Sequence, residues 1–468
     1  MKNNTNFNWR KILALALAAV MLISTIALFL SILAGCQKND PADDPNKIEK
    51  PGYTALKKIT YPEVYAFENI DKRLEVIENY PVEKLFLKAV DDFSYRSAAA
   101  LLAANEQGEN FNFSPLSLYL ALALAISGAG PDSATQMELL DLLGASEALA
   151  TSSQSASTSN LLSTQSKNLY HQLFLKNEIG QLNIANSLWM DDEVNGQKID
   201  FQDKFIENAA QNFFASVYSV DFSDQEKTGA AMAEWISEHT NGKIEPTFNF
   251  DSLQVLSILN TIYFYDQWDR RFDEKTTAPD IFYLSDGNEV EVDFMNQTQS
   301  SASFARGENY TRAVRPLRNG GEMIFILPDE GVNPYSLVDS AEKMEAAFTG
   351  GSQSNGEVVW KMPKFSYDTK LELKEVLQKL GVNAAFTGDA DFSNLSEETQ
   401  IFISNIKQDT FIAVNENGVE AAAFTQIDFD TTSMPTGRAE MILDRPFIFG
   451  ITAPNGSPLF IGLCENPA

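Results

Sequence analysis

The stretch that decides the fold reads NENGVEAAAFTQIDFDTTS and runs from Asn415 to Ser433. Between Val419 and Thr431, every second residue is apolar or small, and the residues between them carry all the charges. This period of two is typical of a β-strand with one buried face. Phe424 is the one clear exception, because it falls in the charged register. The buried register consists of Val419, Ala421, Ala423, Thr425, Ile427, Phe429 and Thr431.

Loop-forming residues follow this strand directly. Ser433–Arg438 reads SMPTGR, and Pro and Gly so close together are typical of an exposed turn. A segment patterned as a buried strand therefore runs into an exposed loop. The pattern alone favours an ordinary edge strand followed by a turn.

The composition describes a globular, acidic protein. Its 468 residues are 44% hydrophobic, which is enough for a large core. Asp and Glu number 64 against 35 Lys and Arg, so the formal charge is −29. This charge repels polyanions, and we expect no nucleic-acid partner.

The N-terminus carries an export signal or a membrane anchor. Basic residues precede an uncharged, mostly apolar run from Ile12 to Gly35, which is long enough to cross a bilayer. The run ends in LAGC (Leu33–Cys36), which resembles a bacterial lipobox in which Cys36 receives the lipid. The alternative is an uncleaved transmembrane helix. Both interpretations place the rest of the chain outside the cytoplasm, either lipid-anchored on the extracellular side of the membrane or secreted.

The chain divides into three parts. Residues 1–35 are the signal peptide, 36–80 a tether with an N-terminal extension, and 81–468 a single domain that we expect to be monomeric. Gln37–Gly52 is too polar to fold alone, so folded structure is expected to begin between Tyr53 and Pro81. The Ser/Thr/Ala-rich stretch Ala148–Ser166 is predicted to be a surface loop.

Hydrophobic periodicity predicts helices first and strands later. The helices are Glu83–Ala104, Leu116–Ile126 and Ala134–Leu143, with Ser114-Pro115 as a helix start. Such an order indicates an α+β fold with large, mostly antiparallel sheets. The predicted strands are Leu182–Met190, Val255–Tyr265, Glu322–Leu327, Val358–Lys364, Ile401–Ile406, Phe411–Val414, Arg445–Ile451 and Leu459–Leu463.

The sequence argues against an enzyme. It lacks the common nucleophile, zinc and phosphate-binding motifs, and we expect no metal or cofactor. The only histidines, His171 and His239, are predicted to be surface helix residues. Cys36 and Cys464 are the only cysteines, so no disulfide framework is available, and Cys464 is predicted to be an inert buried thiol.

A series of motifs from about Val82 to Pro467 resembles the serpin family. Each motif is weak alone, but their order along the chain matches that of serpins. They are NFNFSPLS (Asn110–Ser117), Gly128-Ala129, Gln136-Met137, Leu143-Gly144, ANSLW (Ala185–Trp189), TNGKI (Thr240–Ile244), LNTIYF (Leu259–Phe264) with Trp268 and Phe272, PKF (Pro363–Phe365), Leu380-Gly381, ADFS (Ala390–Ser393), DRPF (Asp444–Phe447) and PLFIG (Pro458–Gly462).

The resemblance implies an inhibitor that acts as a suicide substrate. A protease cuts a reactive-centre loop held outside the central sheet, and the loop then inserts into the sheet as a new strand before the acyl-enzyme hydrolyses. Counting from Glu416 places the bait bond at Thr432-Ser433. The hinge of this loop would comprise Glu416, Gly418, Val419, Glu420, Ala421, Ala422, Ala423 and Thr425.

The resemblance also implies a polar cluster where the sheet opens. Ser114, Ser117 and Asn260 match the family's positions beneath the sheet, and Trp268 matches the tryptophan near the loop's entry point. Gln408 stands where the family usually has a His, so any pH sensitivity from that His is absent. Ordinary helix-start, buried hydrogen-bonding and core roles account for these residues equally well.

The implied function is protease inhibition at the cell surface. The small, uncharged Thr432 suits elastase-like or subtilisin-like serine proteases, and papain-like cysteine proteases are further candidates. Trypsin-like enzymes would merely cut at Arg438, which lies six residues too late for trapping. The alternatives are a non-inhibitory binding or chaperone-like module, favoured if Phe424 or Gln408 prevents insertion, and more distantly an unrecognised hydrolase.

Overall fold

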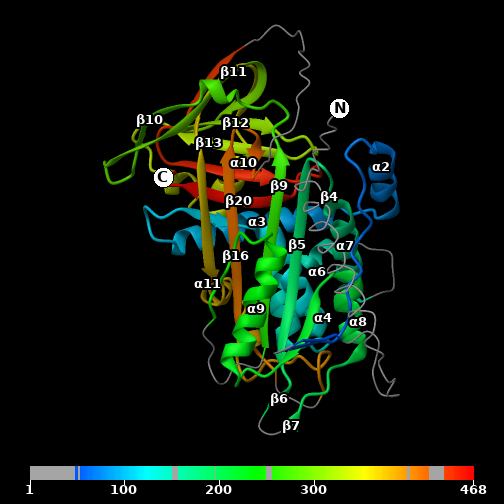
Figure 1. The fold of residues 1–468 in the computed structure, drawn as a ribbon. Helices are drawn as coiled ribbons and strands as arrows, with labels where there is room; N and C mark the ends of the chain where they lie inside the picture. The colour runs from blue at the N-terminus through cyan, green and yellow to red at the C-terminus, as the bar shows by residue number, and fades with distance from the viewer. Residues whose placement is uncertain are drawn as a thin grey trace, which may run out of the picture. The chain divides into compact units, whose positions relative to one another are not determined.

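A large sheet is built from strands that lie far apart in the sequence (Figure 1). The computed structural model describes residues 48–50, 53–149, 157–194, 197–248, 256–397, 401–420 and 437–468. In spatial order, the sheet consists of β1 (Ile48–Lys50), β2 (Tyr53–Ala55), β8 (Ser216–Val220), β5 (Gly180–Asp191), β9 (Leu256–Gln267), β17 (Gly418–Val419), β16 (Ile403–Asn415) and β15 (Phe365–Glu372), with β4 (Leu175–Lys176) beside β5. We call it the central sheet.

A second sheet carries the C-terminal strands. Its order is β18 (Arg438–Ile442), β14 (Ser352–Pro363), β11 (Glu289–Arg306), β12 (Tyr310–Pro316), β13 (Glu322–Pro328), β19 (Phe447–Thr452), β20 (Pro458–Cys464) and β3 (Phe111–Phe113), with β10 (Ala278–Tyr283) beside β11. A small hairpin joins β6 (Glu193–Val194) to β7 (Gln197–Lys198). Most pairings in both large sheets are antiparallel, but β5–β8, β9–β16 and β14–β18 are parallel.

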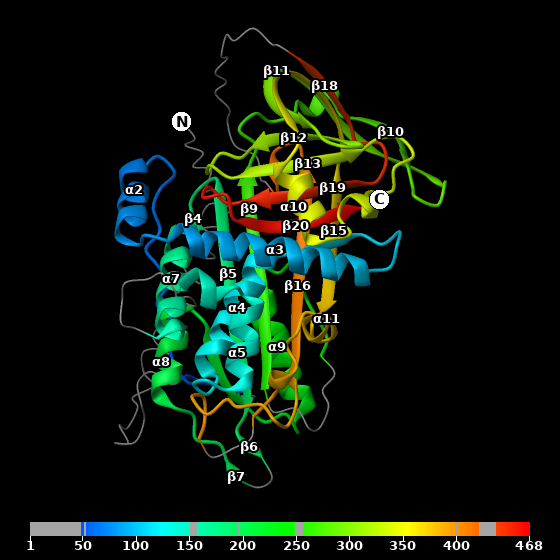
Figure 2. The same ribbon diagram turned by 180° about the vertical axis from the view of Figure 1, so that it is seen from behind.

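Helices cover both faces of the central sheet. Figure 1 shows α9 over one face, and Figure 2 shows α3, α4, α5 and α7 over the opposite face. The helices are α2 (Ile70–Asn79), α3 (Lys84–Ala104), α4 (Pro115–Gly128), α5 (Ala134–Leu142), α6 (Ala145–Leu149), α7 (Thr158–Leu173), α8 (Asp203–Asn212), α9 (Gln225–His239), α10 (Ala341–Thr349) and α11 (Lys374–Lys379). Short 3₁₀ turns occupy Glu274–Thr276, Pro334–Leu337 and Ala384–Phe386. The predicted α+β fold is confirmed.

Helix α4 lies at the centre of the core. It begins with Pro115, whose fixed φ suits the first helical position, and every residue except Ser127 is buried. The helix packs against β5 and β9 of the central sheet and against β20 of the second sheet. Because α4 is apolar on all sides, it joins both sheets into one core.

The N-terminal extension adds two strands to the edge of the central sheet. Strand β2 pairs antiparallel with β8, and the ring of Tyr53 packs edge-on against Trp189 and Tyr218, with centroids 5.6 and 5.0 Å away. The polar tether predicted for Gln37–Gly52 is therefore wrong at its C-terminal end, where Ile48–Lys50 pairs with β2. Backbone pairing needs no apolar side chains, so composition did not reveal it.

Two other boundaries differ from prediction. The surface loop predicted for Ala148–Ser166 is wrong in its second half, because Ser157 accepts a hydrogen bond from Asn160 N (3.4 Å) and starts α7. Leu161 and Leu162 then turn toward the core. The strands predicted at Ile401–Ile406 and Phe411–Val414 are one strand, β16, because the polar residues between them have buried hydrogen-bond partners.

The histidines and Cys464 are all at least partly buried. Cys464 is buried as predicted, and burial raises its pKa. His171 and His239 lie on helices, but neither is a simple surface residue: His171 stacks on Tyr80 at 3.6 Å, and His239 Nδ1 lies 2.8 Å from Trp235 O. Burial lowers the pKa of His171 to about 4. Within the described residues, no helix has the length and apolar character to span a bilayer, and no three His, Cys, Asp or Glu side chains form a metal-binding group.

Candidate functional site

Two parallel strands at the middle of the central sheet pair along only part of their length. Among the described residues, β9 and β16 pair directly from Leu256 and Ile403 to Thr261 and Asp409. Further along, β17 lies between them and is antiparallel to both: Val419 faces Asp266 on one side and Val414 on the other. The sheet is therefore open at one end, and Gly418 and Val419 of the predicted hinge lie in the opening.

Gly418 fits this position because it has no side chain. A Cβ atom there would lie 2.2 Å from Asp266 O and 2.7 Å from Gln267 Cα, and both are backbone atoms that cannot move aside. Its φ of +154° also favours glycine. Val419, the next residue, is 2% exposed. The sequence predicted that the whole loop from Val419 stays outside the sheet until it is cut, but the structure places Val419 inside it.

Glu420 directly follows β17. Glu420 adopts the left-handed conformation with φ +50°, although its N–H still donates to Ala413 O at 2.8 Å. Its carboxylate lies 3.0 Å from Lys243 Nζ and accepts a hydrogen bond from Tyr263 at 3.2 Å. Burial raises the pKa of Glu420. Ala421, Ala422, Ala423, Thr425, Thr432 and Ser433 lie outside the described residues, as does Cys36.

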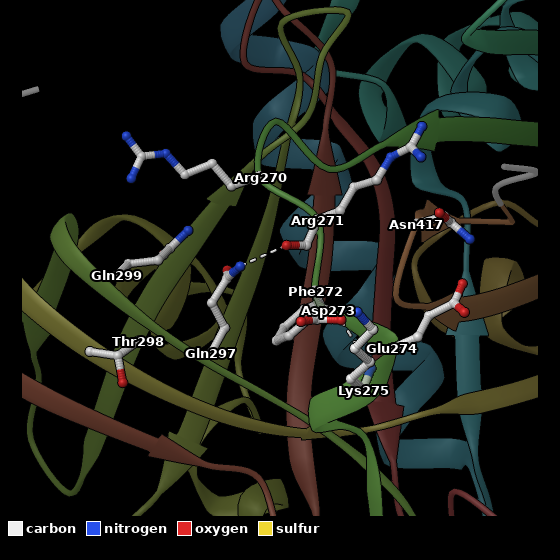
Figure 3. Close-up of a pocket in the computed structure, with 10 residues that line it drawn as sticks. All are labelled: Arg270, Arg271, Phe272, Asp273, Glu274, Lys275, Gln297, Thr298, Gln299 and Asn417. Atoms are coloured by element: carbon white, nitrogen blue, oxygen red, sulfur yellow. Dashed lines mark hydrogen bonds between the residues drawn. The ribbon is translucent and has the colours of Figure 1, made fainter. Parts of the chain in front are cut away.

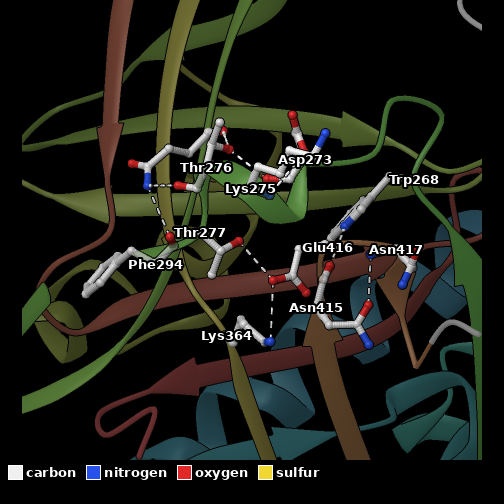
Figure 4. A network of polar contacts seen from close by, with 11 residues as sticks. Trp268, Asp273, Lys275, Thr276, Thr277, Phe294, Lys364, Asn415, Glu416 and Asn417 are labelled. Atoms are coloured by element: carbon white, nitrogen blue, oxygen red, sulfur yellow. Dashed lines mark hydrogen bonds and ion pairs between the residues drawn. The ribbon is translucent and has the colours of Figure 1, made fainter. Parts of the chain in front are cut away.

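Trp268 and Phe272 hold the turn that leads into the hinge, and Figure 4 shows Trp268 beside Asn415 and Asn417. Trp268 donates from its backbone N to Asn417 O at 3.0 Å and from Nε1 to Asn415 O at 2.9 Å. Phe272 N donates to Glu416 O at 3.0 Å. Consecutive backbone carbonyls are therefore bound by one short segment, which we call the hinge clamp (Trp268–Phe272). The structure places Trp268 beside Asn415 and Asn417, next to the predicted hinge.

The Glu416 side chain fastens the same turn to the second sheet. Its carboxylate accepts a hydrogen bond from Thr277 Oγ1 at 2.9 Å and lies 3.4 Å from Lys364 Nζ (Figure 4). Burial acts to raise the pKa of Glu416, but these hydrogen bonds and the lysine charge lower it below its usual value. Lys364 belongs to a motif seen in the sequence, whereas nothing there indicated Thr277.

A buried arginine lies behind the hinge clamp. Arg315 is 1% exposed, and its guanidinium carbon lies 4.0 Å from the ring centroid of Phe272 and 5.1 Å from that of Trp268. Its Nη2 donates to Arg270 O at 2.6 Å and to Gln297 Oε1 at 3.0 Å. No acidic side chain pairs with it in the described part of the chain, and burial lowers its pKa to about 9. Aromatic faces thus partly replace a counter-ion.

A polar pocket opens beside the clamp (Figure 3). It has a volume of about 640 Å³ and is lined by the hinge residue Asn417, by Arg270–Lys275 and by Gln297–Gln299. Gln297 Nε2 donates to Arg271 O at 2.6 Å, which ties the second sheet to the clamp. The pocket therefore borders the hinge turn directly.

The predicted sheet-opening residues meet below the hinge, where β9 and β16 are paired. Gln408 Oε1 accepts from Ser114 N at 2.8 Å, and Gln408 Nε2 donates to Ser114 O at 2.9 Å and to Asn260 Oδ1 at 2.7 Å. Asn260 Nδ2 donates to Ser117 O at 2.8 Å and to Asn186 Oδ1 at 2.5 Å. The two serines contribute backbone atoms, since their buried hydroxyls have no partner among the described residues.

A buried carboxylate faces the hinge from β9. Asp266 is 1% exposed and accepts hydrogen bonds from Asn319 N at 3.1 Å, Asn319 Nδ2 at 2.9 Å and Gln267 N at 2.8 Å. Burial raises its pKa to about 6. Nothing in the sequence indicated that Asp266 is buried, because an Asp at a strand end is usually exposed.

Replacing Gly418 with alanine should expel the hinge from the sheet. The added Cβ cannot coexist with Asp266 O, so β17 should lose its pairing with β9. Hydrogen exchange at the Val419 and Glu420 amides should accelerate at least tenfold. Gly388→Ala is the matched control, since a Cβ there meets nothing within 4 Å. Unchanged protection in Gly418→Ala would contradict the insertion of the hinge.

Replacing Asp266 with asparagine should change how stability depends on pH. Because the folded pKa is raised from 3.8 to about 6, the folded protein keeps a proton that the unfolded chain loses. This contribution is complete below about pH 4 and is lost as pH rises through 6. Relative to wild type, Asp266→Asn should therefore gain up to about 3 kcal/mol between pH 4 and pH 7.5. Thermal melts across this range measure the difference, with the exposed Asp389→Asn as control; parallel curves would contradict the raised pKa.

Comparisons with known proteins agree with this geometry. Residues 88–467 match the family model described as serpin (serine protease inhibitor). The chain is 29% identical over 378 residues to Serpin B11 of Mus musculus, covering 78% of this chain and 95% of that protein. It is 28% identical over 388 residues to the plasma serine protease inhibitor of Homo sapiens, covering 80% and 89%.

Solved structures show the same architecture. The thermophilic serpin tengpin in its native state superimposes with a TM-score of 0.71 at 26% identity, covering 89% of this chain and all of that one. Human thyroxine-binding globulin also has a TM-score of 0.71, at 24% identity, and covers 82% of this chain; this likeness concerns the fold alone. Since the family model spans most of the sequence, the chain belongs to the serpin family of protease inhibitors.

Proposed function

We propose that this serpin is inhibitory and traps its target protease by inserting the cut loop between β9 and β16. The observation that carries the proposal is the position of Gly418 and Val419, which already pair with both strands. A strand continued from Val419 would run antiparallel to both neighbours along the whole sheet. The alternation from Val419 to Thr431 supplies small or apolar residues for the buried face of such a strand.

Full insertion requires β9 and β16 to separate where they now pair. The groups that join them there are backbone hydrogen bonds and the Gln408–Asn260 bond. An inserted strand can replace these bonds with its own, so separation exchanges polar contacts without breaking the apolar core. Gln408 makes this bridge without a titratable group, and we expect insertion not to depend on its protonation.

The reactive bond in this proposal is Thr432-Ser433. Its small, uncharged residues support a target of elastase-like or subtilisin-like specificity, or a papain-like protease. The Leu33–Cys36 motif supports a lipid anchor at Cys36 that keeps the inhibitor at the extracellular face of the membrane.

Protease challenge tests the proposal. The chain incubated with elastase-like and subtilisin-like enzymes should form an SDS-stable complex, and mass spectrometry should locate the cut at Thr432-Ser433. Thr425→Arg places a charge in the buried register, so it should be cut at the wild-type rate but trap at least tenfold less enzyme. Gln426→Arg is the matched control in the exposed register and should trap normally. Equal trapping by both variants, or clean turnover by every enzyme, would rule the mechanism out.

One observation favours the non-inhibitory alternative. Glu420, directly after β17, has a left-handed φ of +50° and is bound by Lys243 and Tyr263. If these contacts outlast cleavage, the protein is a binding or chaperone-like module. The cut protein would then melt at the temperature of the intact one, whereas insertion should raise the melting temperature by tens of degrees.

Arg315 gives a separate test of the hinge clamp. Arg315→Met keeps an apolar side chain among the rings but leaves Arg270 O and Gln297 Oε1 without their donor. The clamp should loosen and insertion should slow, so more inhibitor molecules should be consumed per trapped protease, by severalfold. The melting temperature should fall little, because the variant also removes a buried charge that has no carboxylate partner.

Arg312 provides the matched control for this variant. It lies three residues away on the same strand, is 5% exposed, and donates to Ala347 O at 3.4 Å on the far side from the hinge. Arg312→Met should leave the stoichiometry of inhibition unchanged. If both variants change it equally, Arg315 acts through general stability and not through the clamp.

A further inference from the structure

The N-terminal extension exposes an apolar surface that the core does not use. Helix α2 has no buried residue, and Ile70, Leu74 and Ile77 are 62%, 53% and 51% exposed. Their spacing places them on one face of the helix, and Val64, 50% exposed, precedes it. We call these four residues the α2 ridge. They make up most of the large exposed hydrophobic residues in the described part of the chain.

A shallow pocket extends this surface toward α7. It has a volume of about 270 Å³, and its apolar lining includes Val64, Val76, Ile77, Tyr80 and Phe174. The ridge and the pocket share Val64 and Ile77, so their apolar residues are continuous, although Glu63, Arg73 and Lys176 also line the pocket. A surface of this kind marks an interaction site.

The extension around the ridge is held firmly in place. Phe67 N donates to the Glu178 carboxylate at 3.2 Å, and Arg73 donates to Phe67 O. At the other end, Tyr80 stacks on His171 at 3.6 Å and its carbonyl accepts from Gln172 Nε2 at 2.7 Å. The ridge is therefore a fixed feature of the fold.

The charges near the α2 ridge indicate the electrical character of its partner. Lys72 lies 2.7 Å from Glu75, so this exposed lysine already has an acidic neighbour, and the ridge itself carries no charge. A protein with a formal charge of −29 is repelled by anionic surfaces. The surface suits an electrically neutral apolar partner, such as the interfacial layer of a zwitterionic bilayer.

The chain that precedes the structure brings such a bilayer within reach. The apolar run Ile12–Gly35 and Cys36 lie upstream of Ile48, where the described structure begins. The 12 residues from Cys36 to Ile48 span at most about 40 Å. A chain anchored at this point holds the ridge at high effective concentration beside the membrane, so even weak insertion becomes populated.

We propose that the α2 ridge docks into the interfacial layer of the membrane that anchors the protein. The inference rests on the anchor in the proposed function. Docking would also orient the reactive loop, because Asn319 lines the pocket beside α2 and donates to Asp266, which pairs with Val419. The ridge thus lies at the end of the central sheet where the hinge enters. Docking holds that end close to the bilayer, where membrane-associated proteases act.

Fluorescence quenching by brominated lipid tests the docking. Full-length protein carrying Cys36→Ser, which leaves the buried Cys464 as the only native thiol, is reconstituted through its apolar run into phosphatidylcholine vesicles with brominated acyl chains. An environment-sensitive dye attached through Leu74→Cys should lose at least half of its emission. The dye on Glu75→Cys, on the polar face of α2, and on Met137→Cys, 56% exposed on α5, should be quenched little.

Each other outcome overturns the docking. Unquenched Leu74 in protein that floats with the vesicles shows that the ridge stays in water. Unquenched Leu74 that crosslinks to a second copy shows that the ridge is a dimer contact. Protein that does not float with the vesicles shows that the apolar run Ile12–Gly35 does not hold the chain at the bilayer, which overturns the docking; the lipid anchor at Cys36 is a separate matter, since Cys36→Ser removes it. Failure of the proposed inhibition gives a different result. The protein then forms no protease complex, while the dye at position 74 is still quenched by the lipid.

Discussion

Two parallel strands that share one sheet but part at one end are the constraint on which this structure depends. Strand β16 runs parallel to β9, so the chain that turns back after Asn415 is antiparallel to both of them. The described end of this turn, Gly418 and Val419, lies in the gap between the two strands. In the proposed mechanism, the pairing of β9 and β16 would determine the direction of insertion before any protease acts.

Different residue types admit the backbone between β9 and β16 and oppose its continuation as a strand. Gly418 lets the backbone approach Asp266 more closely than any side chain would allow, and so admits the hinge. Two residues later, Glu420 has a left-handed conformation and a charged partner, which is unfavourable geometry for a continuing strand. A left-handed non-glycine residue costs roughly 1–2 kcal/mol, and a partly exposed ion pair contributes no more than that. This opposition is therefore weak compared with the many backbone hydrogen bonds that a full strand would gain.

The sequence predicted the α+β fold from hydrophobic periodicity, and the resemblance to serpins pointed to the residues that meet at Gln408; the alternation from Val419 to Thr431 stays a prediction, because most of it lies outside the described residues. The sequence did not reveal Arg315 or Asp266. Both are charged residues on strands, where exposure is the normal expectation, and only the tertiary contacts of Trp268, Phe272 and Asn319 explain their burial. Strand β1 was not predicted because it lies in a polar stretch, and backbone pairing with β2 holds it in the sheet. The polar centre of β16 could not be predicted as strand, because its hydrogen-bond partners come from Ser114 before α4, from Asn112 in β3 and from Asn260 in β9.

The buried charges and the exposed ridge gather at the same end of the central sheet. Arg315 and Asp266 each carry a desolvation cost that apolar residues of similar size would avoid, so this end gains less stability from packing than the apolar core around α4. An opening sheet needs such an end, because strands separate most easily where local stability is lowest. The extension lies against this region through Phe67, Glu178 and Arg318. Membrane docking of α2 would thus act on the part of the fold where a small change in free energy most readily alters the position of the hinge.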